Sequence, residues 1–273
     1  MRSAHRLESL PVYVFATLDT KLKALRSRGV DVIRLDIGSP DGPPPDFVIQ
    51  SLAQAAADPA HHGYAGYTGT PHLRHAMVAY YAQRFGVSLD VATEVLPLIG
   101  SKEGIANIAL AWLDPGDLAL VPDPGYPTYA ASVALAGGQV HCMPLDGKNS
   151  WLPDLSAIPE EIAHRARLMW LNYPNNPTGA VAPRAFFEEA VAFCRRYEIL
   201  LCHDAPYADV CFDGYQAPSL LEVPGARDVS VEFNSLSKPH NMAGWRVGMA
   251  VGNAAAVAAL LQTKSNIDSG IFL

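Results

Sequence analysis

The segment Ser235–Gly248 contains the residues best suited to chemistry in this chain. Lys238 follows the serines Ser235 and Ser237 in a stretch that is otherwise apolar and contains glycines, and Arg246 lies further along it. Because burying an ammonium group without a partner is costly, a lysine here is a poor choice for packing. A desolvated amine with a lowered pKa is instead a nucleophile that forms a Schiff base with a carbonyl. The hydroxyls and the arginine are donors that suit a phosphate group, although Lys238 taken alone could be a surface lysine in a loop.

An acidic residue upstream, Asp204, completes this set. It follows the apolar stretch Ile199–Leu201, a predicted strand, and a carboxylate at the end of a buried strand needs a cation or several donors. A protonated pyridine nitrogen is such a cation, and the pairing keeps the ring electron-withdrawing. Lysine, phosphate donors and carboxylate together indicate a site for pyridoxal phosphate (PLP). A metal site at His203 and Asp204 is the alternative, but no further ligand lies at suitable spacing nearby, so we predict no metal.

Three further loops follow predicted strands. Gly100–Gly104 opens a helix, where free N–H groups and the helix dipole form an anion site; simple capping, with Ser101 as the N-cap, is the alternative. Asn172–Gly179 is a turn at a strand end, where Asn176 can donate to a ligand oxygen. Asp123–Tyr129 holds Tyr126 between a glycine and a proline; its ring suits stacking on a flat ligand, and core packing is equally plausible.

Helical and strand-like patterns alternate along the chain, which predicts an α/β fold with a largely parallel sheet. The predicted helices are 18–28, 47–57, 71–85, one that opens at 100–104 and runs through 113, one from 128, 183–197 and one from 254. The predicted strands are 32–37, 94–99, 118–121, 139–143, 168–171, 199–202, 229–233 and 247–251.

The composition is that of an ordinary globular protein. Of its 273 residues, 49% are hydrophobic and 17% are charged, and the net charge of −7 argues against a nucleic-acid-binding surface. Four cysteines form no C-x-x-C pair, so we expect reduced thiols. The N-terminus lacks the apolar core of a signal peptide, and no apolar run reaches the length of a membrane span. We therefore expect a cytoplasmic protein with no membrane or nucleic-acid partner.

Taken in order, these segments resemble the class I/II aminotransferases of the fold type I PLP family. The resemblance runs from Leu35–Asp41 to Asn266–Gly270 and is carried by Asn-Asn-Pro-Thr-Gly, then Asp-x-x-Tyr, then Ser-x-x-Lys with an arginine beyond it. Gly100–Gly104 and Asn241–Arg246 are most similar to the branch of LL-diaminopimelate and alanine aminotransferase-like enzymes. The resemblance implies the PLP-transferase fold of type I, with a mixed, mostly parallel seven-stranded sheet flanked by helices.

The resemblance also implies a role for each matching residue. Lys238 would form the Schiff base and move a proton, and Asp204 would pair with the pyridine nitrogen. Tyr207 and Asn176 would hydrogen-bond the ring hydroxyl, and Tyr126 would stack on the ring. The positions that would bind the phosphate are Ser101, Lys102, Ser235, Ser237 and Arg246, with backbone N–H groups as much as side chains at the first two.

Two more positions, and the domain organisation, follow from the same resemblance. Tyr64 would reach the phosphate of a neighbouring subunit, which implies a homodimer, and Gly38 would line the substrate pocket beside Asn176. Residues 1–40 would form an N-terminal arm and a piece of the small domain, and 41–273 the large PLP-binding domain. We expect the C-terminal small domain, with its arginine for the substrate α-carboxylate, to be absent, because the chain ends at Leu273.

The implied activity is that of a PLP-dependent aminotransferase. It would move an amino group between an L-amino acid and a 2-oxo acid by a ping-pong route. Two alternatives stay open from the sequence: another fold type I activity such as a β-lyase, and a truncated homologue that binds PLP without turnover.

Overall fold

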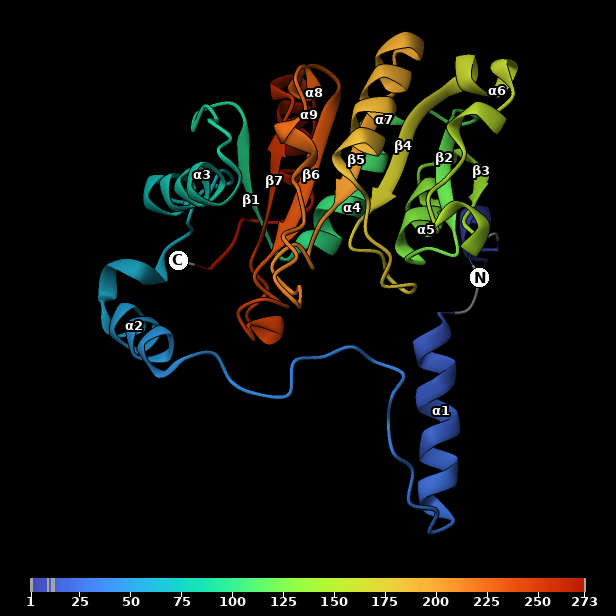
Figure 1. Cartoon of the computed structure of the whole chain (residues 1–273). Coiled ribbons are helices and arrows are strands. Elements are labelled where there is room, and N and C mark those ends of the chain that lie inside the picture. Colours follow the sequence, from blue (N-terminus) through green and yellow to red (C-terminus); the bar gives the residue numbers. More distant parts are fainter. Residues whose placement is uncertain (1, 9, 11–12, 273) are drawn as a thin grey trace.

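A seven-stranded sheet forms the centre of the molecule, seen in a computed structural model that describes residues 2–8, 10 and 13–272 (Figure 1). Its order is β1-β7-β6-β5-β4-β2-β3. Strand β7 is antiparallel to both neighbours, and the other pairs are parallel. The strands are β1 (Val95–Leu98), β2 (Leu118–Asp123), β3 (Gln139–Pro144), β4 (Ala166–Asn172), β5 (Leu200–Asp204), β6 (Ser230–Ser235) and β7 (Gly248–Gly252). The predicted mixed, mostly parallel sheet is confirmed.

Helices cover both faces of this sheet. Helices α3 (Pro71–Phe85) and α7 (Arg184–Tyr197) contribute buried side chains to the core on one face. Helices α4 (Ser101–Trp112), α5 (Thr128–Leu135) and α9 (Ala254–Lys264) do so on the other. The remaining helices with α geometry are α1 (Val14–Ser27), α2 (Asp46–Ala57), α6 (Glu160–Arg165) and α8 (Ala226–Val229). The sequence predicted α3 with its observed bounds and missed the short helix α6.

The central strands are buried on both faces, and their side chains alternate between the two cores. In β5, Leu201 belongs to the core beside α7, whereas Leu200 and Cys202 belong to the core beside α4. This period of two continues to the end of the strand. His203 therefore lies on the α7 side, with its ring centroid 4.9 Å from that of Phe187, and Asp204 lies on the opposite side.

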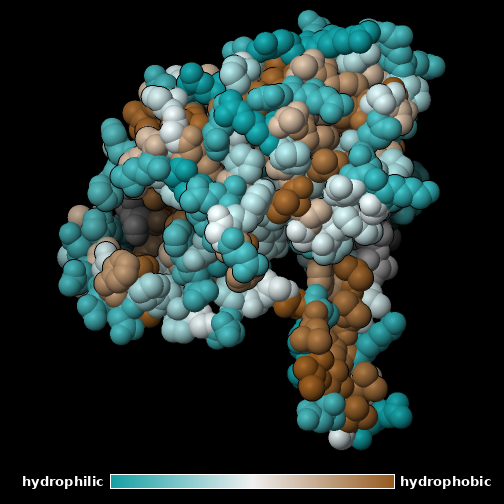
Figure 2. All heavy atoms as spheres, viewed as in Figure 1, coloured by the Kyte–Doolittle hydropathy of each residue, from teal (hydrophilic) through white to brown (hydrophobic). Residues whose placement is uncertain are grey.

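The N-terminal segment lies apart from these layers. Helix α1 projects away from the sheet and a long irregular segment connects it to α2 (Figure 1); no residue of α1 is buried. Apolar side chains run along much of its visible surface (Figure 2). None of the helices that the structure describes is long and apolar enough to cross a membrane.

The predicted strand 32–37 was wrong. This segment has no regular secondary structure, and Ile33 and Leu35 are 83% and 92% exposed. The alternation of apolar and charged residues there has the period of a strand, but a strand also needs a neighbour for its backbone hydrogen bonds. No strand among the described residues pairs with it. Alternation along one segment does not reveal whether a partner exists.

Candidate active site

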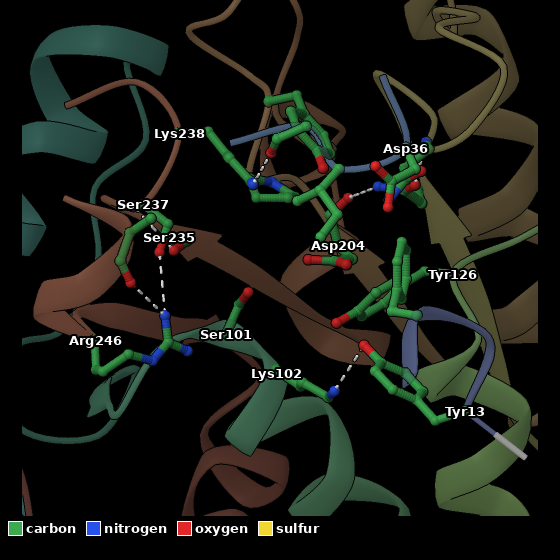
Figure 3. A pocket seen from close by; sticks show the side chains of 18 residues that line it. Tyr13, Asp36, Ser101, Lys102, Tyr126, Asp204, Ser235, Ser237, Lys238 and Arg246 are labelled. Atoms are coloured by element: carbon green, nitrogen blue, oxygen red, sulfur yellow. Dashed lines mark hydrogen bonds between the residues drawn. The ribbon is translucent and has the colours of Figure 1, made fainter. Parts of the chain in front are cut away.

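A cavity of about 500 Å³ lies at the carboxyl ends of β4, β5 and β6, beside the first turn of α4. Figure 3 shows its side chains pointing into one space from these elements and from the N-terminal segment. Its lining residues are Tyr13, Phe15, Asp36, Ile37, Gly38, Ser101, Lys102, Tyr126, Asn172, Asn176, Asp204, Pro206, Tyr207, Ser235, Ser237, Lys238, Ala243 and Arg246. Of the residues that the sequence nominated, only Tyr64 does not line this cavity; its side chain is 89% exposed.

Asp204 is a buried carboxylate of which one oxygen accepts a hydrogen bond and the other does not. The hydroxyl of Tyr129 donates to Oδ2 at 2.7 Å, whereas Oδ1 is buried and has no hydrogen-bond partner within the described chain. Burial raises the pKa of Asp204 to about 6, although the Tyr129 hydrogen bond and the charge of His203 lower it. A buried acceptor without a donor is costly. Oδ1 of Asp204 can therefore accept a hydrogen bond from a cationic or N–H group in the cavity.

The sequence did not nominate Tyr129, although it lies within the same motif as Tyr126. The two rings contact edge to face, with centroids 5.7 Å apart. Tyr129 is fully buried and stacks on Trp170 at 4.8 Å, which fixes the direction of its hydroxyl. The i, i+3 spacing of the two tyrosines at the start of a helix was the available signal. We infer that Tyr129 positions Asp204.

A Tyr129→Phe variant is expected to raise the pKa of Asp204 above about 6, because it removes a donor that stabilises the ionised carboxylate. Affinity for PLP is expected to fall by roughly tenfold, the worth of one charge-assisted hydrogen bond. Carbon-13 NMR of the Asp204 carboxyl group and fluorescence titration with PLP measure the two effects. The control is Tyr173→Phe, which removes a hydroxyl bonded to the Trp151 carbonyl. Equal effects of both variants would contradict the positioning role.

Lys238 is half-buried at the edge of the cavity, in the loop after β6. Burial and the nearby charge of Arg246 lower the pKa of its amine. The amine donates to the backbone carbonyl of Gly38, so the N-terminal segment closes over this side of the cavity. A lysine with a lowered pKa beside an open cavity is suited to attack a carbonyl carbon.

The guanidinium of Arg246 lies against the first turn of α4. Its Nη2 is 3.4 Å from the carbonyl of Ile99 and its Nη1 is 3.5 Å from the hydroxyl of Ser237. This approach needs glycine at position 100, because a Cβ there would lie 2.0 Å from Arg246 Nη2. Gly100 is the N-cap of α4 at φ +75°, so Ser101 is the first helical residue and the capping alternative for its hydroxyl was wrong. Arginine, hydroxyls and the helix start together form an anion site.

Lys102 points to a different part of the cavity. Its amine is 3.3 Å from the Tyr13 hydroxyl and 4.6 Å from the centre of that ring (Figure 3). The backbone N–H groups of Ser101 and Lys102 remain in the unpaired first turn of α4. Tyr207 and Asn176 also line the cavity. Burial and the charge of Asp204 raise the pKa of Tyr207, whereas a hydrogen bond with Asn176 lowers it.

These features fit PLP. The open Oδ1 of Asp204 suits a protonated ring nitrogen, the anion site at α4 suits a phosphate, and Lys238 suits the aldehyde carbon. Tyr126 contributes an aromatic ring to the cavity wall. A cavity of this composition on a mixed α/β sheet defines a PLP-dependent transferase.

The chain belongs to the family of class I and II aminotransferases, whose sequence profile matches residues 30–269. These are PLP-dependent enzymes, so the predicted cofactor and the aminotransferase class are confirmed. The family match gives no support to the β-lyase alternative or to the inactive homologue.

Among known proteins, the chain is 51% identical over 273 residues to LL-diaminopimelate aminotransferase 2 of Nostoc sp., covering 100% of this chain and 70% of that protein. It is 54% identical over 269 residues to LL-diaminopimelate aminotransferase of Desulforudis audaxviator, covering 98% and 69%. A solved structure, a probable N-succinyldiaminopimelate aminotransferase from Thermus thermophilus, is 42% identical with a TM-score of 0.90, covering 95% of this chain and 70% of that one.

Proposed function

We propose that this aminotransferase acts on LL-diaminopimelate, or on an amino acid with the same distal group, and passes the amino group to a 2-oxo acid by a ping-pong route. The names of the relatives from Nostoc sp. and Desulforudis audaxviator support the substrate. The observation in this chain that carries the proposal is the position of Lys102. Within the described residues its ammonium forms no ion pair with a carboxylate and instead lies over the Tyr13 ring in the cavity wall.

Such a cation suits the second carboxylate of a substrate that carries an amino-acid group at each end. Hydrogen bonds between a charged side chain and a substrate carboxylate strengthen binding and fix orientation. The anion site at Arg246 lies on another side of the cavity (Figure 3), so it does not compete for the same group. Lys102 is then a specificity residue as well as a contributor of backbone N–H to the phosphate site.

The other residues have roles that their surroundings support. The amine of Lys238 would hold the cofactor and then take and return the proton at the substrate Cα. Asp204 would hold the ring nitrogen, Tyr207 and Asn176 the ring hydroxyl, and Tyr126 the ring face. The phosphate would be held by Ser101, Lys102, Ser235, Ser237 and Arg246, and Gly38 and Asn176 would face the substrate. When bound, PLP supplies an electron-withdrawing ring that stabilises negative charge at the substrate Cα.

The test is the first half-reaction, followed as a change in the absorbance of the PLP-loaded chain after mixing with single amino acids. We expect LL-diaminopimelate to give the highest ratio of rate to half-saturating concentration in a panel with L-alanine, L-glutamate and L-phenylalanine. A preference for L-alanine or L-phenylalanine would sink the substrate proposal and leave the aminotransferase class standing.

A Lys102→Met variant is expected to raise KM for LL-diaminopimelate by about tenfold or more, the worth of one hydrogen bond to a charged group. KM for L-alanine, which has no distal carboxylate, is expected to change little. Lys148→Met, at an exposed lysine in a surface turn, is the matched control. Equal increases of KM for both substrates would assign Lys102 to cofactor binding alone.

We further propose a cytoplasmic homodimer in which Tyr64 reaches the phosphate of the partner subunit. Its 89% exposure leaves the side chain accessible to a second copy. The four cysteines are free, which suits a reducing compartment. Residues 1–40 are proposed as the N-terminal arm and small-domain piece, and 41–273 as the large PLP-binding domain. The separation of α1 from the layers around the sheet supports this division (Figure 1).

A further inference from the structure

A second ionisable residue lies directly behind the active site. His203 precedes Asp204 in β5, and its side chain is completely buried on the opposite face of the sheet. It does not line the cavity, so substrate and cofactor do not touch it. A buried histidine needs partners for both ring nitrogens, and their identity determines how many protons the ring carries.

Both ring nitrogens of His203 face oxygen atoms. Nε2 is 3.1 Å from the backbone carbonyl of Tyr173, and Nδ1 is 2.9 Å from Oε2 of Glu232. A carbonyl oxygen can only accept a hydrogen bond, so Nε2 carries a proton. The state of the ring then depends on whether the proton between Nδ1 and Glu232 lies on nitrogen or on oxygen.

The surroundings of Glu232 favour the ionised carboxylate. Its Oε1 accepts hydrogen bonds from the hydroxyls of Tyr81 and Ser219, both at 2.8 Å, and its Oε2 accepts from the backbone N–H of Leu220 at 2.8 Å. A carboxylate with several donors is held in its charged form. A neutral Glu232 would leave these donors facing a weaker acceptor, so the shared proton belongs on Nδ1.

We propose that His203 carries a proton on each ring nitrogen, one donated to the Glu232 carboxylate and one to the Tyr173 carbonyl, and that it positions Asp204 and the end of β4 for cofactor binding. The groups that face this pair come from three sides. They are Tyr81 and, beyond it, Tyr80 from α3, Ser219 and Leu220 from the segment before β6, and the ring edge of Phe187 from α7. Burial raises the pKa of Tyr81, and the charge of Glu232 raises it further.

The imidazolium connects three neighbouring strands whose carboxyl ends carry site residues. From β5 it donates to Glu232 in β6 and to the carbonyl of Tyr173, which follows β4. The preceding residue, Asn172, donates to the Asp204 carbonyl at 2.7 Å and accepts from the Asn176 N–H at 2.7 Å. The charged ring donates in both connections, and the donors around Glu232 favour this arrangement over a neutral ring that accepts from a protonated Glu232.

The charge also acts on Asp204 through the sheet. Burial opposes ionisation of Asp204, and the positive charge of His203 is one of the two influences that favour it. A neutral residue at 203 removes that influence. The effect of His203 on cofactor binding rests on the proposed role of Asp204. The charge state assigned to His203 does not depend on that role.

The decisive measurement is proton-coupled NMR of the chain labelled with nitrogen-15 in histidine, at a pH of about 8.5, roughly two units above the ordinary histidine pKa. We expect one histidine ring with two slowly exchanging N–H protons. Assignment comes from loss of that signal in His203→Asn but not in His164→Asn. A single N–H on the His203 ring would overturn the proposal, whatever the enzyme's substrate proves to be.

Two variants test the coupling. Glu232→Gln is expected to convert His203 to a neutral ring with one N–H, because the amide can donate to Nδ1. His203→Asn is expected to raise the pKa of Asp204 by roughly one unit, read from its carbon-13 carboxyl shift in the cofactor-free chain. An unchanged Asp204 pKa in a folded His203→Asn chain would refute the electrostatic part. If Glu232→Gln fails to fold, the measurement on the unaltered chain still decides the charge state. If His203→Asn fails to fold, the signal is assigned through proton–proton contacts between the His203 ring and the Phe187 ring, whose centroids are 4.9 Å apart.

Discussion

A Lys238→Ala variant is expected to retain PLP only by noncovalent contacts and to lose turnover by at least about 10²- to 10⁴-fold, the contribution of a positioned acid–base group. We expect this loss because the proposed site gives one amine two tasks, covalent attachment of the cofactor and proton transfer at the substrate Cα. Its lowered pKa, caused by burial and by Arg246, provides the unprotonated form that both tasks require.

Absorbance spectroscopy of the PLP-loaded chain measures the first task directly. The Schiff-base band of the unaltered chain is expected to be missing in Lys238→Ala and present in Lys148→Ala, which removes an exposed lysine from a surface turn. Persistence of the band in Lys238→Ala would place the attachment elsewhere and refute the assignment.

An Asp204→Asn variant is expected to make the cofactor-free chain more stable near neutral pH while reducing turnover of the loaded enzyme. Burial raises the pKa of Asp204 from 3.8 to about 6 in the folded chain. Between these values the folded chain binds more protons than the unfolded chain, so its stability falls as pH rises. Above about pH 6 the full cost, roughly 3 kcal/mol, is present in the unaltered chain and absent in the variant.

Urea unfolding of both cofactor-free chains at about pH 4 and about pH 7.5 measures this difference. We expect the two free energies of unfolding to converge at the lower pH and to separate at the higher one. The loaded variant is expected to lose more rate than cofactor affinity, because a neutral amide no longer holds the ring nitrogen protonated. Parallel pH dependences of stability would show that the Asp204 pKa is not raised by folding.

The fold could be predicted from the sequence because its signals are local. Apolar runs bounded by glycine and proline mark the strands, and Pro71 and Gly86 mark the start and end of α3. The prediction failed at 32–37, where the pattern is that of a strand but the partner is missing. Pairing is a relation between distant segments, so alternation within one segment could not supply it.

The site was predictable where chemistry depends on the residue type itself. Charged side chains are unusual in apolar segments, and each needs an ion-pair or hydrogen-bond partner. This applies to Lys238, Asp204 and Arg246. Tyr129, in α5, and Tyr13, just before α1, were missed because an aromatic residue in or beside a helix is ordinary packing until its hydroxyl is located. The direction of the Lys102 side chain was missed for a different reason. A side chain in the first turn of a helix can point either to the helix start or to a neighbouring segment, and the sequence does not distinguish the two.

Glu103, Lys264 and Asp268 join the active site to the far end of the described chain. Glu103 holds the N–H of Ile99 at 3.0 Å, and the buried amine of Lys264 binds Glu103 at 3.3 Å and Asp268 at 2.8 Å. Displacement of Asp268 would leave Glu103 as the remaining carboxylate bound to Lys264. Because Glu103 also accepts the hydrogen bond from Ile99, a shift of Lys264 would alter the turn before α4. A chain of hydrogen bonds and ion pairs therefore runs from the turn before α4, which is proposed to bind the phosphate, to the segment after α9.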